Sequence, residues 1–213
     1  MLNSVFTLYI ERWSWFMGLL LEHIWICGTA LFFGSFIGLL LGIWIAEREY
    51  FAPVIMGGVN FVYTIPAISL LGLLIPFLGV GNKTAIMALS LYALLPMVRN
   101  TYAGLHSVDA EIIEAARGMG STALQILLRI KLPLALFIII AGVRNMVVMT
   151  ISVASIASFI GAGGLGVAVF RGIATNNLAM TFAGSLMIAL LALFCELLLG
   201  QFEKYLKKRR RMY

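Results

Sequence analysis

Charged residues are scarce in this sequence of 213 residues. Asp, Glu, Lys and Arg together make up 11% of the chain, whereas about a quarter of a typical soluble domain is charged. Hydrophobic residues make up 62%, and the mean hydropathy is +1.03. A soluble domain of this size leaves much of its surface in water and could not bury so much apolar area. The composition therefore excludes an ordinary soluble domain and predicts a protein embedded in lipid.

Cysteine and the motifs of common enzymes are also in short supply. Cys27 and Cys195 both lie in apolar runs, so we expect two small buried hydrophobic side chains rather than a disulfide or a metal site. The chain has no HExxH zinc motif, nucleophile elbow, paired intramembrane acids or Walker A lysine loop. We therefore predict a protein that is not an enzyme and that holds no metal or cofactor of its own. Its first residues also lack the basic region and cleavage site of a signal peptide.

Five stretches are apolar and long enough to form transmembrane helices, which need about 20 residues. They are residues 24–46, 53–79, 84–105, 133–160 and 179–199. We therefore predict an all-α, polytopic membrane protein with about five transmembrane helices. Its membrane domain covers 24–199, after an extracytoplasmic segment, 1–23, and before a basic tail, 200–213. Pro66 and Pro76 predict a kink or a break in the second stretch, and the sequence leaves open whether that stretch forms one helix or two.

Lys and Arg residues are distributed unevenly between the linkers. If the tail is cytoplasmic and there are five spans, the N-terminus lies outside, and eleven of the fifteen Lys and Arg residues lie on the cytoplasmic side. Arg99 is counted on that side, three others lie outside, and Arg144 lies within a span. Cytoplasmic linkers are enriched in Lys and Arg, so this orientation is predicted, and with it a cytoplasmic linker at 107–133. The basic tail is interpreted as a membrane anchor rather than as a nucleic-acid site.

The linker 107–133 is the one long, charged interruption of the apolar sequence. Asp109 is expected to cap a short helix, Gly120 to supply the left-handed position that ends it, and Ser121 to cap a second helix. Pro133 disfavours helical geometry at the residue before it and is expected to begin the next span. Such a pair of helices either lies under the membrane or forms a docking surface, and the small alanines in it favour docking.

A signature with a fixed spacing runs through this linker. Glu-Ala-Ala is followed by a glycine after three intervening residues and by Ile-Lys-Leu-Pro after nine more. The signature positions are Glu114, Ala115, Ala116, Gly120, Ile130, Leu132 and Pro133. The pattern resembles the EAA loop of binding-protein-dependent ABC importer permeases, in which the loop forms a coupling helix that sits in a cleft of the ATPase subunit. The resemblance implies a type I permease fold, like that of methionine permeases, and a role for these residues in docking the ATPase.

The resemblance covers roughly residues 20 to 205 and implies the partners and the place of the protein. They are a dimer of ATPase subunits that binds the ATP, a second permease chain that is identical or different, and an extracytoplasmic substrate-binding protein, all at a bacterial cell membrane. The segments "YTIPAISLLGLLIPFLGVG", "LLPMVRNTYAGL" and "SFIGAGGLG" are similar to the permeases for glycine betaine, carnitine and choline. Methionine-type permeases share the "GAGGLG" segment, so methionine or another amino acid remains the alternative substrate.

Polar residues within the spans are candidates for the translocation pathway. They are Asn60, Tyr63, Thr64, Tyr92, Arg144, Ser152 and Ser155. The alternative role for such residues is hydrogen bonding between helices. An arginine in a membrane is costly and suggests a function, and Arg144 would suit the carboxylate of a betaine. A structural role for Arg144 is equally open. The sequence also leaves open whether Glu196 lies close enough to pair with it. Tyrosine rings would suit a quaternary ammonium, which is held by aromatic faces.

A glycine-rich segment follows the fourth span. Gly161, Gly163, Gly164 and Gly166 formally match a dinucleotide-binding motif, but a membrane helix rather than a strand precedes them. We interpret them as a tight turn on the outer face and as candidate contacts of the binding protein. His23 and His106 are both interpreted as residues at the membrane interface.

Two other classes of protein are weighed against a permease subunit. A self-contained secondary transporter or channel would show duplicated halves and intramembrane ionisable residues for ion coupling. This chain has no visible repeat, and Arg144 is the one arginine that the orientation count assigns to a span. An assembly or scaffold protein would not require the full signature. Both alternatives are therefore less favoured than a transport subunit.

Overall fold

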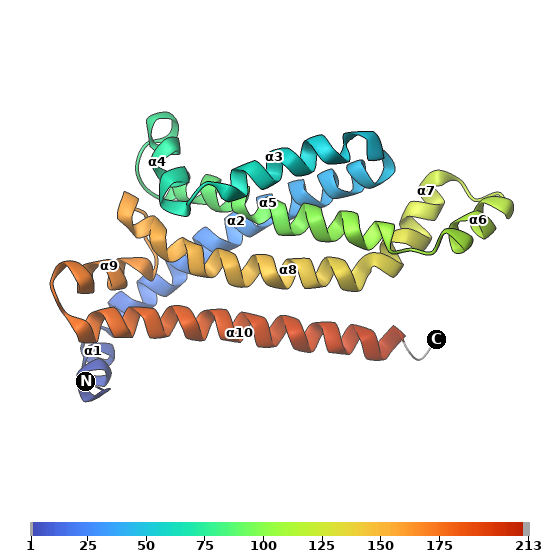
Figure 1. Cartoon of the computed structure of the whole chain (residues 1–213). Coiled ribbons are helices and arrows are strands. Elements are labelled where there is room, and N and C mark those ends of the chain that lie inside the picture. Colours follow the sequence, from blue (N-terminus) through green and yellow to red (C-terminus); the bar gives the residue numbers. More distant parts are fainter. Residues whose placement is uncertain (1, 211–213) are drawn as a thin grey trace.

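A computed structural model of the chain describes residues 2–210. This part is almost entirely helical and contains no strand (Figure 1). Its elements are α1 (Leu2–Glu11), α2 (Trp13–Glu47), the 3₁₀ turn η1 (Glu49–Phe51), α3 (Ala52–Thr64), α4 (Ala67–Leu78), α5 (Asn82–His106), α6 (Ala110–Gly118), α7 (Ala123–Ile126), the π-helical turn η2 (Leu127–Lys131), α8 (Leu132–Ala154), the 3₁₀ turn η3 (Ser155–Ile160), α9 (Gly166–Ala174) and α10 (Leu178–Arg210).

The long helices α2, α5, α8 and α10 run lengthwise through the molecule (Figure 1). The short helices α6 and α7 lie at the end where α10 finishes, and α1 and α9 lie at the opposite end. The closest helix pairs are α2 with α5 and α5 with α8. The helix α5 is therefore the centre of the bundle, and short helices lie at both ends of it.

Among residues 2–210, three helices are long and apolar enough to cross a membrane: Trp13–Glu47, Ala123–Ile160 and Leu178–Arg209. A fourth candidate is the pair Glu49–Thr64 and Ala67–Leu78, which passes the same test as a unit although it is bent by 99°. The predicted span at 84–105 forms α5, which is long enough but does not pass on composition. An all-α membrane protein is thus confirmed, and the fifth span stays a prediction for this central helix.

The second apolar stretch forms two helices, which answers the question that the sequence left open. The break lies at Ile65, whose ψ of 124° is extended, and at Pro66, whose missing N–H cannot continue the helix. The hydroxyl of Tyr92 on α5 donates a hydrogen bond to the carbonyl oxygen of Ile65. This hydrogen bond from α5 therefore stabilises the bend between α3 and α4.

Helix α2 begins at Trp13 rather than near residue 24. The sequence placed the boundary later because Glu22 and His23 are polar, but both side chains have partners inside the fold. The amide of Asn82 donates to Glu22 at 2.8 Å, and the Nε2 atom of His23 lies 3.2 Å from the carbonyl oxygen of Ile151. His23 is 1% exposed, so its side chain packs inside the protein, and its predicted position at the membrane interface stays a prediction.

The other predicted boundaries also shift. Helix α10 runs without interruption through residue 210, so no structural boundary separates a tail at 200 from the membrane domain. Residues 211–213 lie outside the described part of the chain. The fourth stretch forms α8 and then tightens into η3. His106 is partly exposed at the end of α5, where Nε2 lies 3.0 Å from the carboxylate of Glu49.

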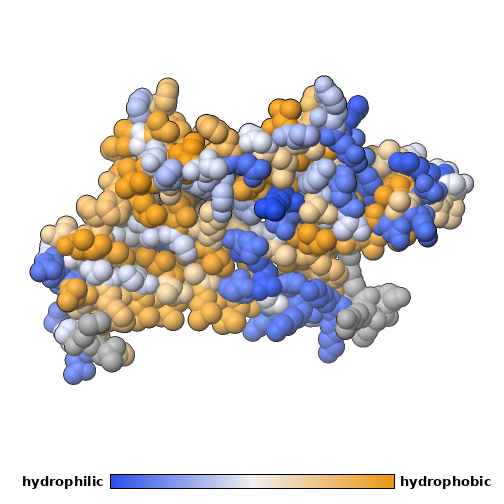
Figure 2. All heavy atoms as spheres, viewed as in Figure 1, coloured by the Kyte–Doolittle hydropathy of each residue, from blue (hydrophilic) through white to orange (hydrophobic). Residues whose placement is uncertain are grey.

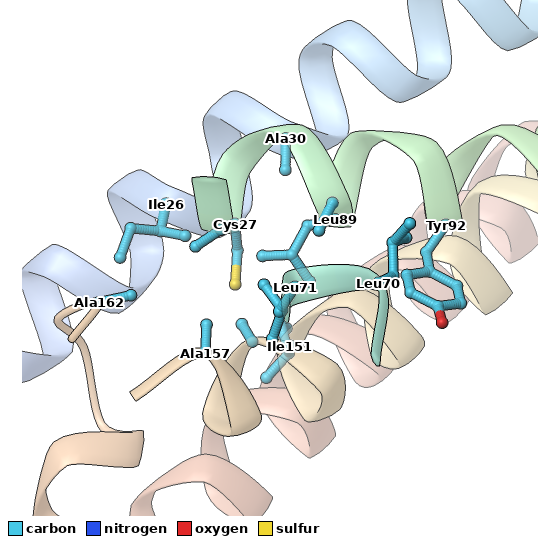
Figure 3. Packing of buried hydrophobic residues seen from close by; sticks show 13 residues of the cluster. Ile26, Cys27, Ala30, Leu70, Leu71, Leu89, Tyr92, Ile151, Ala157 and Ala162 are labelled. Atoms are coloured by element: carbon cyan, nitrogen blue, oxygen red, sulfur yellow. The ribbon is translucent and has the colours of Figure 1, made fainter. Parts of the chain in front are cut away.

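The largest buried cluster lies between α2, α4, α5, α8 and η3 (Figure 3). Its labelled members are Ile26, Cys27, Ala30, Leu70, Leu71, Leu89, Tyr92, Ile151, Ala157 and Ala162. Cys27 is 3% exposed, Cys195 is half-buried, and both are free thiols, which confirms that they pack as hydrophobic side chains. Since lipid tails are as apolar as this cluster, close packing rather than transfer from water holds the helices together.

A row of glycines brings α2 and α5 into contact. Gly34, Gly38 and Gly42 recur every four residues along α2 and are buried. A Cβ atom placed on Gly38 would lie 2.7 Å from the Cβ atom of Met97, and one on Gly34 would lie 2.4 Å from the Cβ atom of Ala93. Neither separation is possible between real side chains. The missing side chains therefore let the two backbones approach, as small residues do in other pairs of membrane helices.

Replacing Gly38 with alanine is expected to destabilise the protein by about 1–3 kcal/mol, because the added methyl group overpacks the α2–α5 contact. Gly28→Ala is the matched control on the same helix, since a Cβ atom there meets nothing within 4 Å and alanine favours a helix by about 1 kcal/mol over glycine. Thermal unfolding in lipid nanodiscs compares the two. Equal stability of both variants would contradict the close approach.

Candidate functional site

The linker 107–133 forms two short helices at the end of the molecule. The side chain of Asp109 accepts a hydrogen bond from the backbone N–H of Glu111 at 2.9 Å and caps α6, as expected. Gly120 follows α6 with a φ of +81°, a left-handed value that glycine adopts without strain. The second cap is Thr122 rather than the predicted Ser121: Thr122 and Gln125 exchange hydrogen bonds in a capping box, at 2.8 and 3.3 Å.

The connection from this linker to the next span is one continuous helical path. Leu132 is helical, with φ −60° and ψ −45°, so the expectation that Pro133 would interrupt the helix before it was wrong. The reason is η2, in which the N–H of Leu132 bonds to the carbonyl of Leu127, five residues earlier rather than four. This wider turn lets the chain enter α8 with the proline near its start. A displacement of α7 is therefore passed directly to α8.

The seven signature residues differ in exposure. Glu114, Ala115 and Gly120 are exposed on the outside of the linker, and Ala116 is 1% exposed and packed inward. Ile130 in η2 and Leu132 and Pro133 at the start of α8 are half-buried. Glu114, Ala115 and Gly120 are thus available to a partner, whereas the last three signature residues lie where the linker joins α8.

The same linker exposes large apolar side chains while ion pairs hold its base in place. The exposed residues are Ile112, Met119, Leu124 and Leu128. Met119 is 80% exposed, and a group of exposed apolar side chains such as this one marks an interaction surface. Below the linker, Lys131 donates to Glu47 at the end of α2 at 2.7 Å. The linker therefore presents an apolar surface on an anchored base.

Arg144 lies between two carboxylates of α10. Its Nη1 atom donates to Glu203 at 2.5 Å and its Nη2 atom donates to Glu196, while Lys207 donates to the second oxygen of Glu203 at 2.6 Å. Glu196 therefore does reach Arg144. Two cations and two anions balance within this network, which joins α8 to α10. Of the two roles that the sequence left open for Arg144, this geometry favours the structural one.

Most other predicted pathway residues donate hydrogen bonds to backbone carbonyl oxygens of this chain. Ser152 and Ser155 donate to carbonyl oxygens of their own helix at 3.0 and 2.7 Å, and Thr64 donates to Phe61 at 2.7 Å. Tyr92 is 6% exposed and supports the α3–α4 break. Asn60 is exposed on α3.

A polar groove of about 510 Å³ opens between α3, α5 and α8. It is lined by Tyr63, Leu95, Pro96, Arg99, Asn100, Ala103, Asn145 and Met149. Figure 2 shows hydrophilic atoms gathered on this face, between α3 and α10, with apolar surface on the other parts of the helices. Of the seven predicted pathway residues, only Tyr63 lines this groove.

The sequence analysis missed Arg99, because it counted this residue as cytoplasmic at the end of the third apolar stretch. The structure places Arg99 on α5, seven residues before the helix ends, and exposed to the groove. The signal that could have found it is the segment "MVRN", in which two polar residues interrupt a span before its expected end.

The glycine-rich segment forms the expected tight turn. Gly161 and Gly164 have φ values of +73° and +87°. The backbone N–H of Gly163 donates to the side chain of Asn82 at 2.8 Å, and that of Gly164 donates to Glu22 at 3.1 Å. Gly164 and Gly166 are buried and only Gly161 is exposed. The turn therefore joins the end of η3 to the start of α5 and to Glu22, within α2. Its predicted contact with a binding protein stays a prediction.

Comparison with known proteins places this geometry in a family. The family described as binding-protein-dependent transport system inner membrane component matches residues 34–212. The chain belongs to this family. It is a multi-pass membrane protein and the permease subunit of an ABC importer, a class that works with an ATPase and a binding protein.

Individual relatives agree with this assignment. The chain is 37% identical over 206 residues to the carnitine transport permease protein of Listeria monocytogenes, covering 96% of this chain and 92% of the relative. It is 36% identical over 206 residues to the glycine betaine/carnitine/choline transport system permease protein of Bacillus subtilis, covering 96% and 90%. The inward-facing MetNI methionine ABC transporter has the same fold, with a TM-score of 0.82 at 23% identity over 92% of this chain and 98% of that one.

Proposed function

We propose that this permease, paired with a second identical or different permease chain, forms the translocation pathway for a quaternary-amine osmoprotectant such as glycine betaine, carnitine or choline. A separate ATPase dimer binds the ATP and supplies the energy, and an extracytoplasmic binding protein delivers the substrate. The permease itself performs no catalysis. The observation that carries the substrate class is the similarity, along nearly the whole chain, to permeases named for carnitine and for glycine betaine, carnitine and choline.

The groove between α3, α5 and α8 supports this class of substrate. A quaternary ammonium group has no hydrogen to donate, so a protein holds it against aromatic faces. Tyr63 lines the groove and is 38% exposed there, and its ring meets that of Tyr92 edge to face at 5.9 Å. A methionine importer shares the fold, but fold likeness alone does not select a substrate.

Energy would enter through the exposed linker. An ATPase that covers Met119 and Leu124 buries apolar surface, and Glu114 beside them offers a charge to basic or backbone donors of the partner. The continuous path from α7 through η2 into α8 would carry the movement to the groove. Lys131 and Glu47 would carry the same movement to α2.

Gly120→Ala is expected to reduce uptake per ATP hydrolysed, since alanine at a φ of +81° costs about 1–2 kcal/mol and distorts the turn between α6 and α7. Gly118→Ala is the matched control, because Gly118 lies within α6 without a positive φ, and neither glycine has an atom within 4 Å of an added Cβ atom. Uptake and ATP hydrolysis are measured in proteoliposomes with all subunits. Equal coupling in both variants would refute the role of the turn.

The proposed orientation places α6, α7 and the C-terminus in the cytoplasm and α9 outside. A cysteine at Thr175, beyond α9, is expected to react with an impermeant maleimide in intact cells, whereas one at Arg117 should react only after permeabilisation. Both sites are exposed, and Cys27 and Cys195 are replaced beforehand. The reverse pattern of labelling would overturn the orientation.

The substrate class is tested by uptake in cells that lack their own transporters and express the permease with its partner subunits. Labelled glycine betaine, carnitine or choline is expected to accumulate, and accumulation should disappear when the ATPase is omitted. Accumulation of methionine alone would refute the quaternary-amine assignment while leaving the permease function intact. Accumulation without the ATPase would instead indicate a self-contained transporter.

A further inference from the structure

Arg99 is a cation on α5, within the predicted span 84–105, and it has no ion-pair partner among the residues that the structure describes. It lies about 10 Å before the end of α5, at a rise of 1.5 Å per residue, and its side chain is exposed to the polar groove. No ion pair or side-chain hydrogen bond joins it to any residue that the structure describes. Unpaired cations within a membrane are costly and mark substrate or ion pathways. The position of Arg99 therefore calls for an anion that is not part of this chain.

The contrast with Arg144 sharpens this requirement. Arg144 has two carboxylates, Glu196 and Glu203, on α10. The groove holds no acidic side chain at all among its lining residues, so nothing there neutralises Arg99. Arg144, which the sequence marked as a carboxylate site, is already paired with carboxylates of this chain. Arg99 is available to bind the carboxylate of a ligand.

The remaining lining residues favour a ligand with two different ends. The amide nitrogen of Asn100, a lining residue, donates to the carbonyl of Pro96 at 2.7 Å, and its amide oxygen has no donor among the described residues. The hydroxyl of Tyr63 donates to the sulfur of Met149 at 3.2 Å, which fixes the ring at the groove wall. One wall thus offers a guanidinium and another an aromatic ring, within a volume of about 510 Å³ that suits a small organic molecule.

We propose that Arg99 binds the carboxylate of a zwitterionic quaternary amine during translocation, while the ring of Tyr63 receives its ammonium group. The inference rests on the proposed function and adds a specificity to it: the pathway favours carboxylated substrates such as glycine betaine and carnitine over choline, a bare cation that Arg99 repels. Arginine suits this task because its planar guanidinium donates two parallel hydrogen bonds to a carboxylate.

The test compares uptake by the complete transporter in proteoliposomes, with the same binding protein in every sample. Arg99→Gln is expected to lower kcat/KM for glycine betaine or carnitine roughly ten- to a hundredfold, the size of a lost charge-assisted hydrogen bond. Choline uptake should be unchanged or increased. Arg99→Lys should recover part of the loss because it keeps the charge. Since the binding protein is constant, its own selectivity cancels when variants are compared.

Arg48→Gln is the matched control, an exposed loop arginine outside the groove with no side-chain partner among the described residues. Thermal unfolding and ATP hydrolysis stimulated by the binding protein are measured for each variant, and both should stay at the wild-type level in Arg99→Gln. Unchanged uptake of carboxylated substrate, or an equal loss for carboxylated substrate and choline, would overturn the inference. If the wild type carries no choline, the glycine betaine and lysine-rescue results decide. A wild type that carries no quaternary amine would refute the proposed function instead.

Discussion

The direct contact between the backbones of α2 and α5 is the constraint on which the rest of the structure depends. Glycines at positions 34, 38 and 42 remove the side chains that would separate the two helices. Because the hydrophobic effect does not drive association within lipid, this close packing is a main source of cohesion. It sets α5 in the centre of the bundle, where Tyr92 supports the α3–α4 break and Arg99 reaches the groove. A wider separation of α2 and α5 would change both the support of the α3–α4 break and the position of Arg99.

The few charged residues within the bundle fall into two groups with different physical settings. Arg144, Glu196, Glu203 and Lys207 satisfy one another and join α8 to α10. Such a balanced network removes the penalty of isolated charges in a membrane and fixes how two helices meet. Within the described part of the chain Arg99 has no such compensation, and its charge is open to a ligand. Charge is thus used for assembly on one side of α8 and for recognition on the other.

Both ends of the bundle are fastened by specific polar contacts. At one end the glycine-rich turn donates two backbone N–H groups to Asn82 and Glu22, which ties together elements distant in the sequence. At the other end Lys131 bonds to Glu47 beneath the exposed linker. A force applied to the linker therefore acts on α8 and α2 together. The groove lies between these ends, where movement of α8 against α5 changes its shape.

The sequence by itself determined the helical membrane character, the cap at Asp109, the left-handed Gly120 and the signature of the linker, because these depend on local composition and spacing. It began the first span later than α2 begins, since the partners of Glu22 and His23 lie on α5 and α8, far away in the chain. For the same reason it made Arg144 a pathway candidate and counted Arg99 only as a cytoplasmic residue. Only the tertiary structure decided that Arg144 meets two carboxylates while Arg99 faces an open groove, because the state of a charge depends on which side chains the packing brings within reach of it.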